Sequence, residues 1–360
     1  MNKTTLANLV KQKKLQLKRG MVISKKDIQK SPGPFPIYSS SVKDLGLFGT
    51  YALSMFDEEL ITWSVDGGGH FFHRSKHKFS VTNVCGYIRV SDPDIHVKYL
   101  AYHLQYEHSH KFFDYTSKAH PSVISKAYVI SLPPLVEQQK IAAVLSDIDA
   151  LIETQEALIA KKKDVKAATM ELLLTGKKRL PGFNSEWVIR PFSQIAIRLN
   201  LKGNQLPSTD YLPTGDIPVI DQGREFIAGY TNSINLAFDC PNGGVIVFGD
   251  HTCIFKYINF NFAAGADGTQ IFAVIPEQSC IFHYYQLDFE GVKSTGYNRH
   301  YKQLKEKELF CPSYDEQIAI SKMLTDLDDM IFSYELEVLK MNKTKSALMH
   351  KLLTGEIRLP

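Results

Sequence analysis

Basic and aromatic side chains gather in two short stretches of the sequence, and they are the residues best suited to chemistry. The first stretch follows three consecutive glycines, and its basic residues are His70, His73, Arg74, Lys76, His77 and Lys78. Lys and Arg neutralise phosphates, and Arg and His can read base edges, so this stretch predicts contact with DNA. The alternative is a solvated hairpin whose phenylalanines enter the core. The histidine spacing also suits a metal ion, but no cysteine or carboxylate stands nearby to complete a tetrahedral site, so we expect no metal.

The second stretch combines stacking, amide, guanidinium and ammonium groups in consecutive residues: Tyr297, Asn298, Arg299, His300, Tyr301 and Lys302. Asn and Arg are the side chains that pair with the edges of adenine and guanine through two hydrogen bonds. Other polar residues in predicted loops are candidates for DNA contact, namely Lys118, His120, Ser122, Lys126, Lys202, Gln222, Arg224, His251 and Thr269. For these residues ordinary turn chemistry or a solubilising role is the alternative.

Motifs for catalysis are absent from the sequence. It contains no G-x-x-x-x-G-K-[ST] phosphate loop, no G-x-S-x-G nucleophile elbow and no Asn-Pro-Pro-aromatic or Asp-Pro-Pro-aromatic tetrapeptide for holding a flipped base. Paired carboxylates such as Asp147 and Asp149 lie in a predicted helix, where capping, solvation or a partner contact is the simpler role. We therefore expect this chain alone to be no enzyme and to hold no cofactor.

An internal repeat decides which elements position these residues. Leu173-Leu174-Thr175-Gly176 recurs as Leu352-Leu353-Thr354-Gly355, an offset of 179 residues (353 minus 174). The offset holds without a gap back to Glu137-Gln138, which matches Glu316-Gln317. A gapless match of this length indicates two copies of one unit, and we expect a pseudo-twofold internal repeat.

Each copy of the repeat reads as one long helix. Apolar residues recur at spacings of three and four, prolines precede each run, and a glycine follows it. At 1.5 Å per residue, the segment from Glu137 to Leu174 would form a helix about 57 Å long. Because so broad an apolar stripe must be buried, we expect the two helices to form an antiparallel coiled coil. The alternative is two core helices of a larger helical bundle.

Globular sequence precedes each helix. These regions are rich in glycine, proline and aromatic residues, and they contain short β-favouring runs such as 59–65 and 244–248. The predicted fold class is α+β, with two mixed α/β domains separated by two long helices. The predicted boundaries are 1–134 for the first domain, 135–176 for the first helix, 177–312 for the second domain, and 313–360 for the second helix and its tail.

The composition fits a folded chain of this kind. The 360 residues are 44% hydrophobic, and this apolar fraction is too high for a disordered protein. The formal net charge of +4 is too small for a polybasic protein. The five cysteines never form a C-x-x-C pair, which disfavours a disulfide framework and a structural zinc site. No stretch approaches ~20 consecutive apolar residues, so we expect a soluble protein of the cytoplasm.

The flanks of the two helices carry a family resemblance. Leu132-Pro133-Pro134-Leu135 leads into Glu137-Gln138, and both helices end in Leu-Leu-Thr-Gly. Together with the size of the globules, these segments make nearly the whole chain similar to the specificity subunits of type I restriction-modification systems. The resemblance implies that each globule is a target-recognition domain that reads one half of a bipartite double-stranded DNA target. It also implies that the helices fix the spacer between the two halves.

Partner proteins are a further implication of the resemblance. Two modification subunits, which are methyltransferases, would dock on the helices, and restriction subunits would add translocation and cleavage. S-adenosylmethionine, ATP and Mg would belong to those partners. The helix residues expected to contact them are Glu137, Gln138, Ile141, Leu145, Ile152, Glu316, Gln317, Ile320, Leu324 and Ile331.

Two other functions stay open at this point. A non-enzymatic coiled-coil adaptor whose globules bind protein would be favoured if reversing the charges of Arg299, Lys302, Arg74 and Lys78 left DNA affinity unchanged. A self-contained DNA methyltransferase or endonuclease would be favoured if the chain alone bound S-adenosylmethionine.

Overall fold

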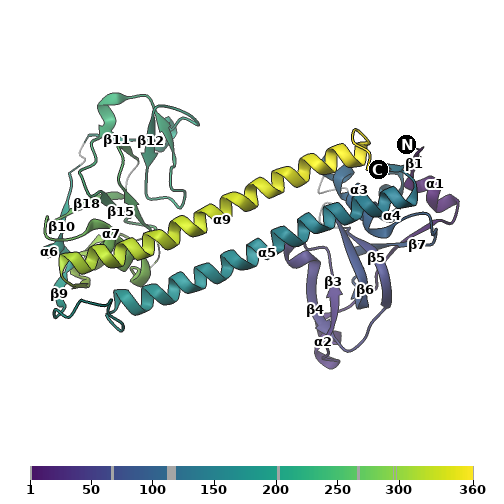
Figure 1. Cartoon of the computed structure of the whole chain (residues 1–360), viewed down its shortest axis with the longest axis horizontal. Helices are drawn as coiled ribbons and strands as arrows, with labels where there is room; N and C mark the ends of the chain where they lie inside the picture. The colour runs from purple at the N-terminus through teal and green to yellow at the C-terminus, as the bar shows by residue number, and fades with distance from the viewer. Residues whose placement is uncertain are drawn as a thin grey trace. The chain divides into compact units, whose positions relative to one another are not determined.

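The computed structural model describes residues 2–65, 69–111, 119–200, 203–265, 268–294, 296 and 298–359. The chain divides into two compact units, which we describe one at a time. Unit 1 comprises Met1–Glu156 and Leu336–Pro360, and unit 2 comprises Ala157–Glu335. Both predicted long helices are present, as α5 (Leu135–Leu174) and α9 (Tyr314–Thr354), and each runs through both units (Figure 1).

Unit 1 is built around a six-stranded sheet with the strand order β2-β7-β5-β6-β3-β4, and a smaller sheet pairs β1 with β8. Its strands are β1 Asn2–Thr5, β2 Leu15–Arg19, β3 Phe35–Tyr38, β4 Leu47–Tyr51, β5 Phe56–Ser64, β6 Phe71–Val81, β7 Cys85–Val90 and β8 Val129–Leu132. Its helices, besides its parts of α5 and α9, are α1 Leu6–Lys11, α2 Lys25–Lys30, the 3-10 turn η1 Lys43–Gly46, α3 Val97–Ser109 and α4 Pro121–Ala127.

Helix α3 connects the sheet of unit 1 to the long helices. On one side, its Leu100 and Leu104 belong to a core cluster with Ile61 and Trp63 of β5. On the other side, its Tyr99 packs in a cluster with Ile141 and Leu145 of α5 and with Leu352 and Leu353 of α9. The globule is therefore joined to both helices of its unit by buried apolar contacts.

His103 of α3 makes the stability of unit 1 depend on pH. Its Nε2 accepts a hydrogen bond from the backbone N–H of Ser131 at 3.1 Å, and burial lowers its pKa to about 4. The unfolded chain has a histidine pKa of about 6.5, so it binds more protons, and folding stability falls as the pH drops from 6.5 toward 4.

We predict that His103→Gln, which supplies an uncharged acceptor, reduces this pH dependence. Between pH 6.5 and 5, unfolding free energies from urea titrations should fall less steeply in the variant, by up to ~1.4 kcal/mol per pH unit. Equal slopes for the variant and the wild type would show that His103 is protonated in the folded state.

Unit 2 contains two larger sheets. One has the order β10-β18-β15-β16, the other has the order β11-β17-β12-β13 with β14 also beside β17, and a small sheet pairs β9 with β19. The strands are β9 Val188–Pro191, β10 Ala196–Arg198, β11 Gln205–Leu206, β12 Ile217–Ile220, β13 Gly229–Thr231, β14 Ala237–Phe238, β15 Val245–Gly249, β16 Phe255–Ile258, β17 Phe262–Gly265, β18 Thr269–Val274 and β19 Glu308–Cys311. The helices are α6 Phe192–Ile195, α7 Cys280–Glu290 and α8 Tyr301–Glu306, with 3-10 turns η2 Ser208–Asp210 and η3 Ile234–Leu236.

Helix α7 has the same role in unit 2 that α3 has in unit 1. Its Phe282 and Tyr285 pack in one buried cluster with Leu173 and Leu174 of α5 and with Leu324 of α9. Its Leu287 reaches the other way, into the core that contains Phe248 and Phe272 of the first sheet. Each globule is thus joined to the long helices through one short helix of its own.

A buried glutamine fixes the start of each long helix. In unit 1, Gln138 accepts a hydrogen bond from the backbone N–H of His96 at 2.9 Å and donates to the carbonyls of Asp94 and Pro133. In unit 2, Gln317 accepts from the N–H of Ser279 at 2.8 Å and donates to the Pro312 carbonyl. His96 and Ser279 cap α3 and α7, so each glutamine ties a long helix to the helix that carries the globule.

Polar contacts between α5 and α9 run in opposite sequence directions within each unit. In unit 1 the contacting pairs are Glu137 with Arg358, Asp149 with Lys345, and Gln155 with Glu337. In unit 2 they are Lys163 with Glu335, Lys166 with Asp328, and Arg179 with Glu316. Because the α9 number falls as the α5 number rises, the two helix segments are antiparallel in both units.

Among the residues that the structure describes, no helix is both long enough and apolar enough to cross a lipid bilayer. In the same part of the chain, no three His, Cys, Asp or Glu side chains are grouped so that they could hold a metal ion.

Candidate nucleic-acid interface

Four loops that lie far apart in the sequence meet in unit 2. The N–H of His251, in the turn after β15, donates to Oε1 of Gln222 at 3.3 Å, and Thr252 Oγ1 donates to the Gln222 carbonyl at 2.6 Å. A ring nitrogen of His251 lies 3.2 Å from the carbonyl of Asn298. The N–H of Asp250 donates to the carbonyl of Gly268, at the turn before β18. The structure therefore brings together segments that the sequence offered as separate candidates.

Asp250 organises the segment before α8. Its side chain is 2% exposed, and its Oδ1 accepts hydrogen bonds from the backbone N–H groups of His300 at 2.8 Å and Tyr301 at 2.7 Å. His300 is fully buried, and its Nδ1 donates to the Asp250 carbonyl at 2.9 Å. Held in this way, the segment leaves Asn298, Arg299 and Lys302 exposed.

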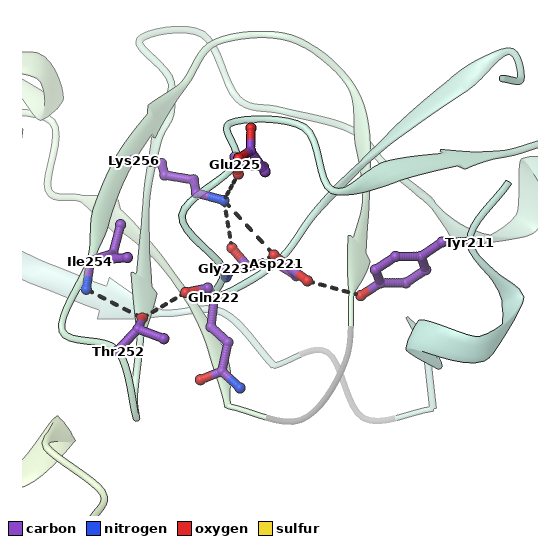
Figure 2. A network of polar contacts seen from close by, with 8 residues as sticks. All are labelled: Tyr211, Asp221, Gln222, Gly223, Glu225, Thr252, Ile254 and Lys256. Atoms are coloured by element: carbon purple, nitrogen blue, oxygen red, sulfur yellow. Dashed lines mark hydrogen bonds and ion pairs between the residues drawn. The ribbon is translucent and has the colours of Figure 1, made fainter. Parts of the chain in front are cut away.

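Lys256 holds the turn that carries Gln222 and Arg224. Figure 2 shows its ammonium group reaching from β16 to that turn, where it donates to the carbonyls of Asp221 at 2.9 Å and Glu225 at 2.5 Å. Asp221 Oδ1 lies 3.9 Å away and accepts from the N–H of Gly223. Burial lowers the pKa of Lys256, and the acidic neighbours Asp221 and Glu225 oppose that shift. The result is a fixed turn on which Arg224 is exposed and Gln222 is half-buried.

A glycine is required at position 268, where the backbone approaches the side chain of Gln222. Its φ is +92°, and a Cβ there would lie 2.6 Å from the side-chain oxygen of Gln222. A residue without a side chain is the one that tolerates both conditions. Thr269, the next residue and a predicted DNA contact, is 3% exposed.

In unit 1 the predicted basic stretch forms strand β6, except for His70, which precedes the strand. Lys76 and Lys78 are exposed, and His70 and His77 are half-buried. His73 is also half-buried and lies 2.6 Å from Glu59 of β5; burial lowers its pKa, and Glu59 opposes the shift. Lys76 and Lys78 are thus the side chains of the stretch that remain open to a phosphate.

Arg74 is turned inward and supports a loop. It is 4% exposed, and its guanidinium carbon lies 3.6 Å above the ring of Tyr38. It donates to Thr62 Oγ1 at 3.0 Å and to the carbonyl of Leu45 at 2.5 Å. Leu45 has a backbone φ of +52°, which residues other than glycine rarely adopt. The hydrogen bond from Arg74 to the Leu45 carbonyl therefore stabilises the unusual turn η1. These contacts favour a positioning role for Arg74, and direct contact with DNA stays a prediction.

The second candidate patch of unit 1 lies beside the first. The N–H of Ala119 donates to the Val65 carbonyl at 2.8 Å, and Trp63 Nε1 donates to the Ala119 carbonyl at 2.7 Å. The next residues, His120 and Ser122, are exposed at the start of α4, as is Lys126 at its end. Val65, the residue after β5, thus contacts the start of α4, as the turn after β15 meets the start of α8 in unit 2. Three predicted contacts, Lys118, Lys202 and Tyr297, lie outside the described residues.

The helix residues predicted to contact partners are buried within the chain. Glu137, Ile331 and Ile152 are 6%, 7% and 8% exposed, and the others are at or near zero. The exposed large apolar residues of the long helices are instead Val136, Val144, Leu151, Val165, Leu172, Tyr314, Ile318, Met323, Met330, Phe332, Leu336 and Leu339. In unit 2, Val165, Met323 and Met330 line a groove of about 460 Å³ between α5 and α9. A partner protein would meet this second set of side chains.

Comparisons with known proteins agree with one another. Residues 12–162 match the family model of the type I restriction modification DNA specificity domain. The specificity subunit of the type I restriction enzyme MpnII from Mycoplasma pneumoniae is 33% identical over 140 residues, which cover 38% of this chain and 42% of that protein. Another M. pneumoniae protein, named as a type I specificity subunit, is 24% identical over 329 residues, 86% of each chain.

The matched length differs among relatives. The chain spans about half the length of some curated relatives, 53% and 45% for two from M. pneumoniae. Among solved structures, the S subunit of a type I restriction-modification system from M. genitalium superposes with a TM-score of 0.67 at 17% identity, covering 98% of this chain and 96% of that one. The structural likeness shows that the two chains share a fold.

Proposed function

We propose that the chain is a specificity subunit of a type I restriction-modification system, as the family model over residues 12–162 and the relatives indicate, and that it recognises a bipartite sequence in double-stranded DNA. Each globule would read one half of the target. The observation that carries the proposal is the meeting of four loops in unit 2, with Arg224, Asn298, Arg299 and Lys302 exposed around it. Arg and Asn can read base edges, and Lys can neutralise phosphate.

We further propose that residues 1–134 and 177–312 are the two target-recognition domains. The helical segments 135–176 and 313–360 would form an antiparallel coiled coil that makes the chain a pseudo-twofold repeat and fixes the spacer. Support comes from the contacts that recur in each unit: a buried glutamine at the helix start, an Arg–Glu pair and an Asp–Lys pair.

As partners we propose two modification subunits and the restriction subunits, docked on the long helices. The exposed apolar residues of α5 and α9 support this, since large apolar patches on a surface usually mark protein contacts. Catalysis would then belong to the partners, which would bring S-adenosylmethionine, ATP and Mg, while this chain acts without catalysis of its own in the cytoplasm.

A charge reversal in unit 2 tests DNA recognition. We predict that Arg299→Glu with Lys302→Glu weakens DNA binding on the order of a hundredfold and lowers the slope of log affinity against log salt by about 1 to 2, one unit for each of the two side chains that contacts phosphate. Gel-shift titrations of the purified chain with its modification subunits, at several salt concentrations, would measure both.

The control makes the same change of net charge on the exposed face of α9, with Lys340→Glu and Lys343→Glu. This control should bind DNA nearly as the wild type does. If both double variants lost affinity to the same extent, net charge alone would govern binding, and the proposed interface would be wrong.

A further inference from the structure

We propose that two matching Tyr–Asp–Lys clusters act as joints that set the register of each globule on its pair of helices, and that they thereby determine which spacer length is accepted. The joints are Tyr102–Asp149–Lys345 in unit 1 and Tyr285–Asp328–Lys166 in unit 2. The link to spacer length rests on the proposed function, whereas the joints themselves are contacts within each unit.

In unit 1, three elements meet at one carboxylate. Tyr102 of α3 donates its hydroxyl to Oδ2 of Asp149 on α5 at 2.6 Å. Lys345 of α9 lies 2.5 Å from the other oxygen, Oδ1, and its ammonium group stands 6.0 Å from the centre of the Tyr102 ring. Each oxygen of Asp149 therefore fixes a different neighbour, one from the globule and one from the opposite helix.

Unit 2 builds the same joint with the two helices exchanged. Tyr285 of α7 donates to Oδ2 of Asp328 on α9 at 2.8 Å. Lys166 of α5 lies 2.5 Å from Oδ1 of Asp328 and 5.3 Å from the centre of the Tyr285 ring. Burial and the neighbouring carboxylate raise the pKa of Tyr102. Burial is also the main cause that raises the pKa of Tyr285. Both hydroxyls therefore remain donors at neutral pH.

The recurrence of the joint argues against an incidental contact. Asp149 and Asp328 are 179 residues apart (328 minus 149), as are Lys166 and Lys345 (345 minus 166), so both pairs follow the helix repeat. The tyrosines lie in globules whose sequences differ far more, and their separation is 183 (285 minus 102). Two dissimilar globules thus present the same hydroxyl to the same position of the repeat.

The chemistry of the joint suits positioning better than stabilisation. The Asp side chains are about 40% exposed, and ion pairs that water reaches add little to folding stability. A carboxylate that binds two partners at short distances nevertheless fixes their relative placement, because hydrogen bonds weaken steeply away from their preferred geometry. A slip of one helix by one residue, about 1.5 Å, would break the joint.

Spacer preference is the property that tests the joints. The variants are Tyr102→Phe with Tyr285→Phe, which removes two hydroxyls and leaves the rings, and Asp149→Asn with Asp328→Asn. The control is Glu335→Gln, which removes an ion pair between Lys163 and Glu335 that involves no globule residue. The two half-sites and the gap between them would first be identified by selecting bound fragments from a random duplex library. Affinities would then be measured for duplexes that carry these half-sites at that matched gap, and at gaps one base pair longer and shorter.

The expected result is a loss of gap preference at nearly unchanged affinity for the matched gap. Wild type and Glu335→Gln should prefer the matched gap on the order of tenfold, a typical cost of one misplaced base pair, and the joint variants should not. If both sets of joint variants keep the preference, or if the control loses it too, the joints do not set register. If the wild type binds none of these duplexes selectively, the proposed function fails instead. The Tyr→Phe set keeps the test valid if the Asp→Asn set does not fold.

Discussion

Asp250→Ala is expected to abolish recognition of one half-site and to destabilise unit 2 by about 3 kcal/mol. The carboxylate is buried and accepts from two backbone N–H groups, those of His300 and Tyr301. Removing it deprives the N–H of Tyr301 of its acceptor, at a cost of ~1–3 kcal/mol. The N–H of His300 loses a charged acceptor and keeps the Asp250 carbonyl at 3.0 Å, so its loss is smaller. The segment that presents Arg299 and Lys302 would lose its anchor. Urea unfolding and DNA binding to a duplex with both half-sites would measure the two effects.

Asp250→Asn is the matched control for this prediction. It keeps one acceptor oxygen at nearly the same place and removes only the charge. Its loss of stability should be clearly smaller, and part of the DNA affinity should remain. An alanine variant with wild-type stability and affinity would mean that Asp250 does not hold the segment before α8.

Arg179→Met is expected to destabilise unit 2 by about 3 kcal/mol, near the low end for breaking a buried ion pair. Two guanidinium nitrogens of Arg179 lie 2.6 Å from the two oxygens of Glu316, and Trp187 Nε1 donates to the same carboxylate at 3.0 Å. The Glu316 side chain is 0% exposed, whereas Arg179 is 28% exposed. Without Arg179 the Glu316 carboxylate would stay buried with Trp187 Nε1 as its remaining side-chain donor. The start of α9 would then be held less firmly.

The repeat supplies a matched variant in unit 1. Arg358 makes the same bidentate contact with Glu137. Its side chain is 53% exposed, so water can replace its hydrogen bonds more readily. Arg358→Met should therefore cost less than Arg179→Met in thermal or urea unfolding. Equal losses, or a larger loss for Arg358→Met, would contradict the account of burial given for Glu316.

The long helices could be predicted from the sequence because their signals are local. Apolar spacing of three and four, the prolines before each run and the following glycines define α5 and α9 closely. The strands of the globules were harder to predict from the sequence, because short strands pair with strands that are far away along the chain, as β3 does with β6 and β12 with β17. Such pairings are set by tertiary packing, which no short window of sequence contains.

The candidate site was predicted only in part, for reasons of geometry. Residue type suggested Arg74 as a DNA contact, but its guanidinium packs on the ring of Tyr38 and donates to the Leu45 carbonyl, whereas Lys76 and Lys78 on the same strand stay exposed. Lys256 and Asp221 were missed; a lysine within the otherwise apolar strand Phe255–Ile258 was the available signal.

The predicted partner contacts show a related effect. The positions that were chosen, such as Leu145 and Leu324, are the apolar ones that match between the repeats, and those are the ones that pack inside each unit. The exposed residues Val144 and Met323, one position away along each helix, are the better candidates for a partner surface.

Selection of bound fragments from a random duplex library tests the central claim most directly. The purified chain with its modification subunits would be mixed with the library, and the retained duplexes sequenced. The account predicts two short enriched motifs separated by a gap of one fixed length whose bases are not selected. A single uninterrupted motif, or no enrichment at all, would contradict the claim that two globules each read one half of a divided target.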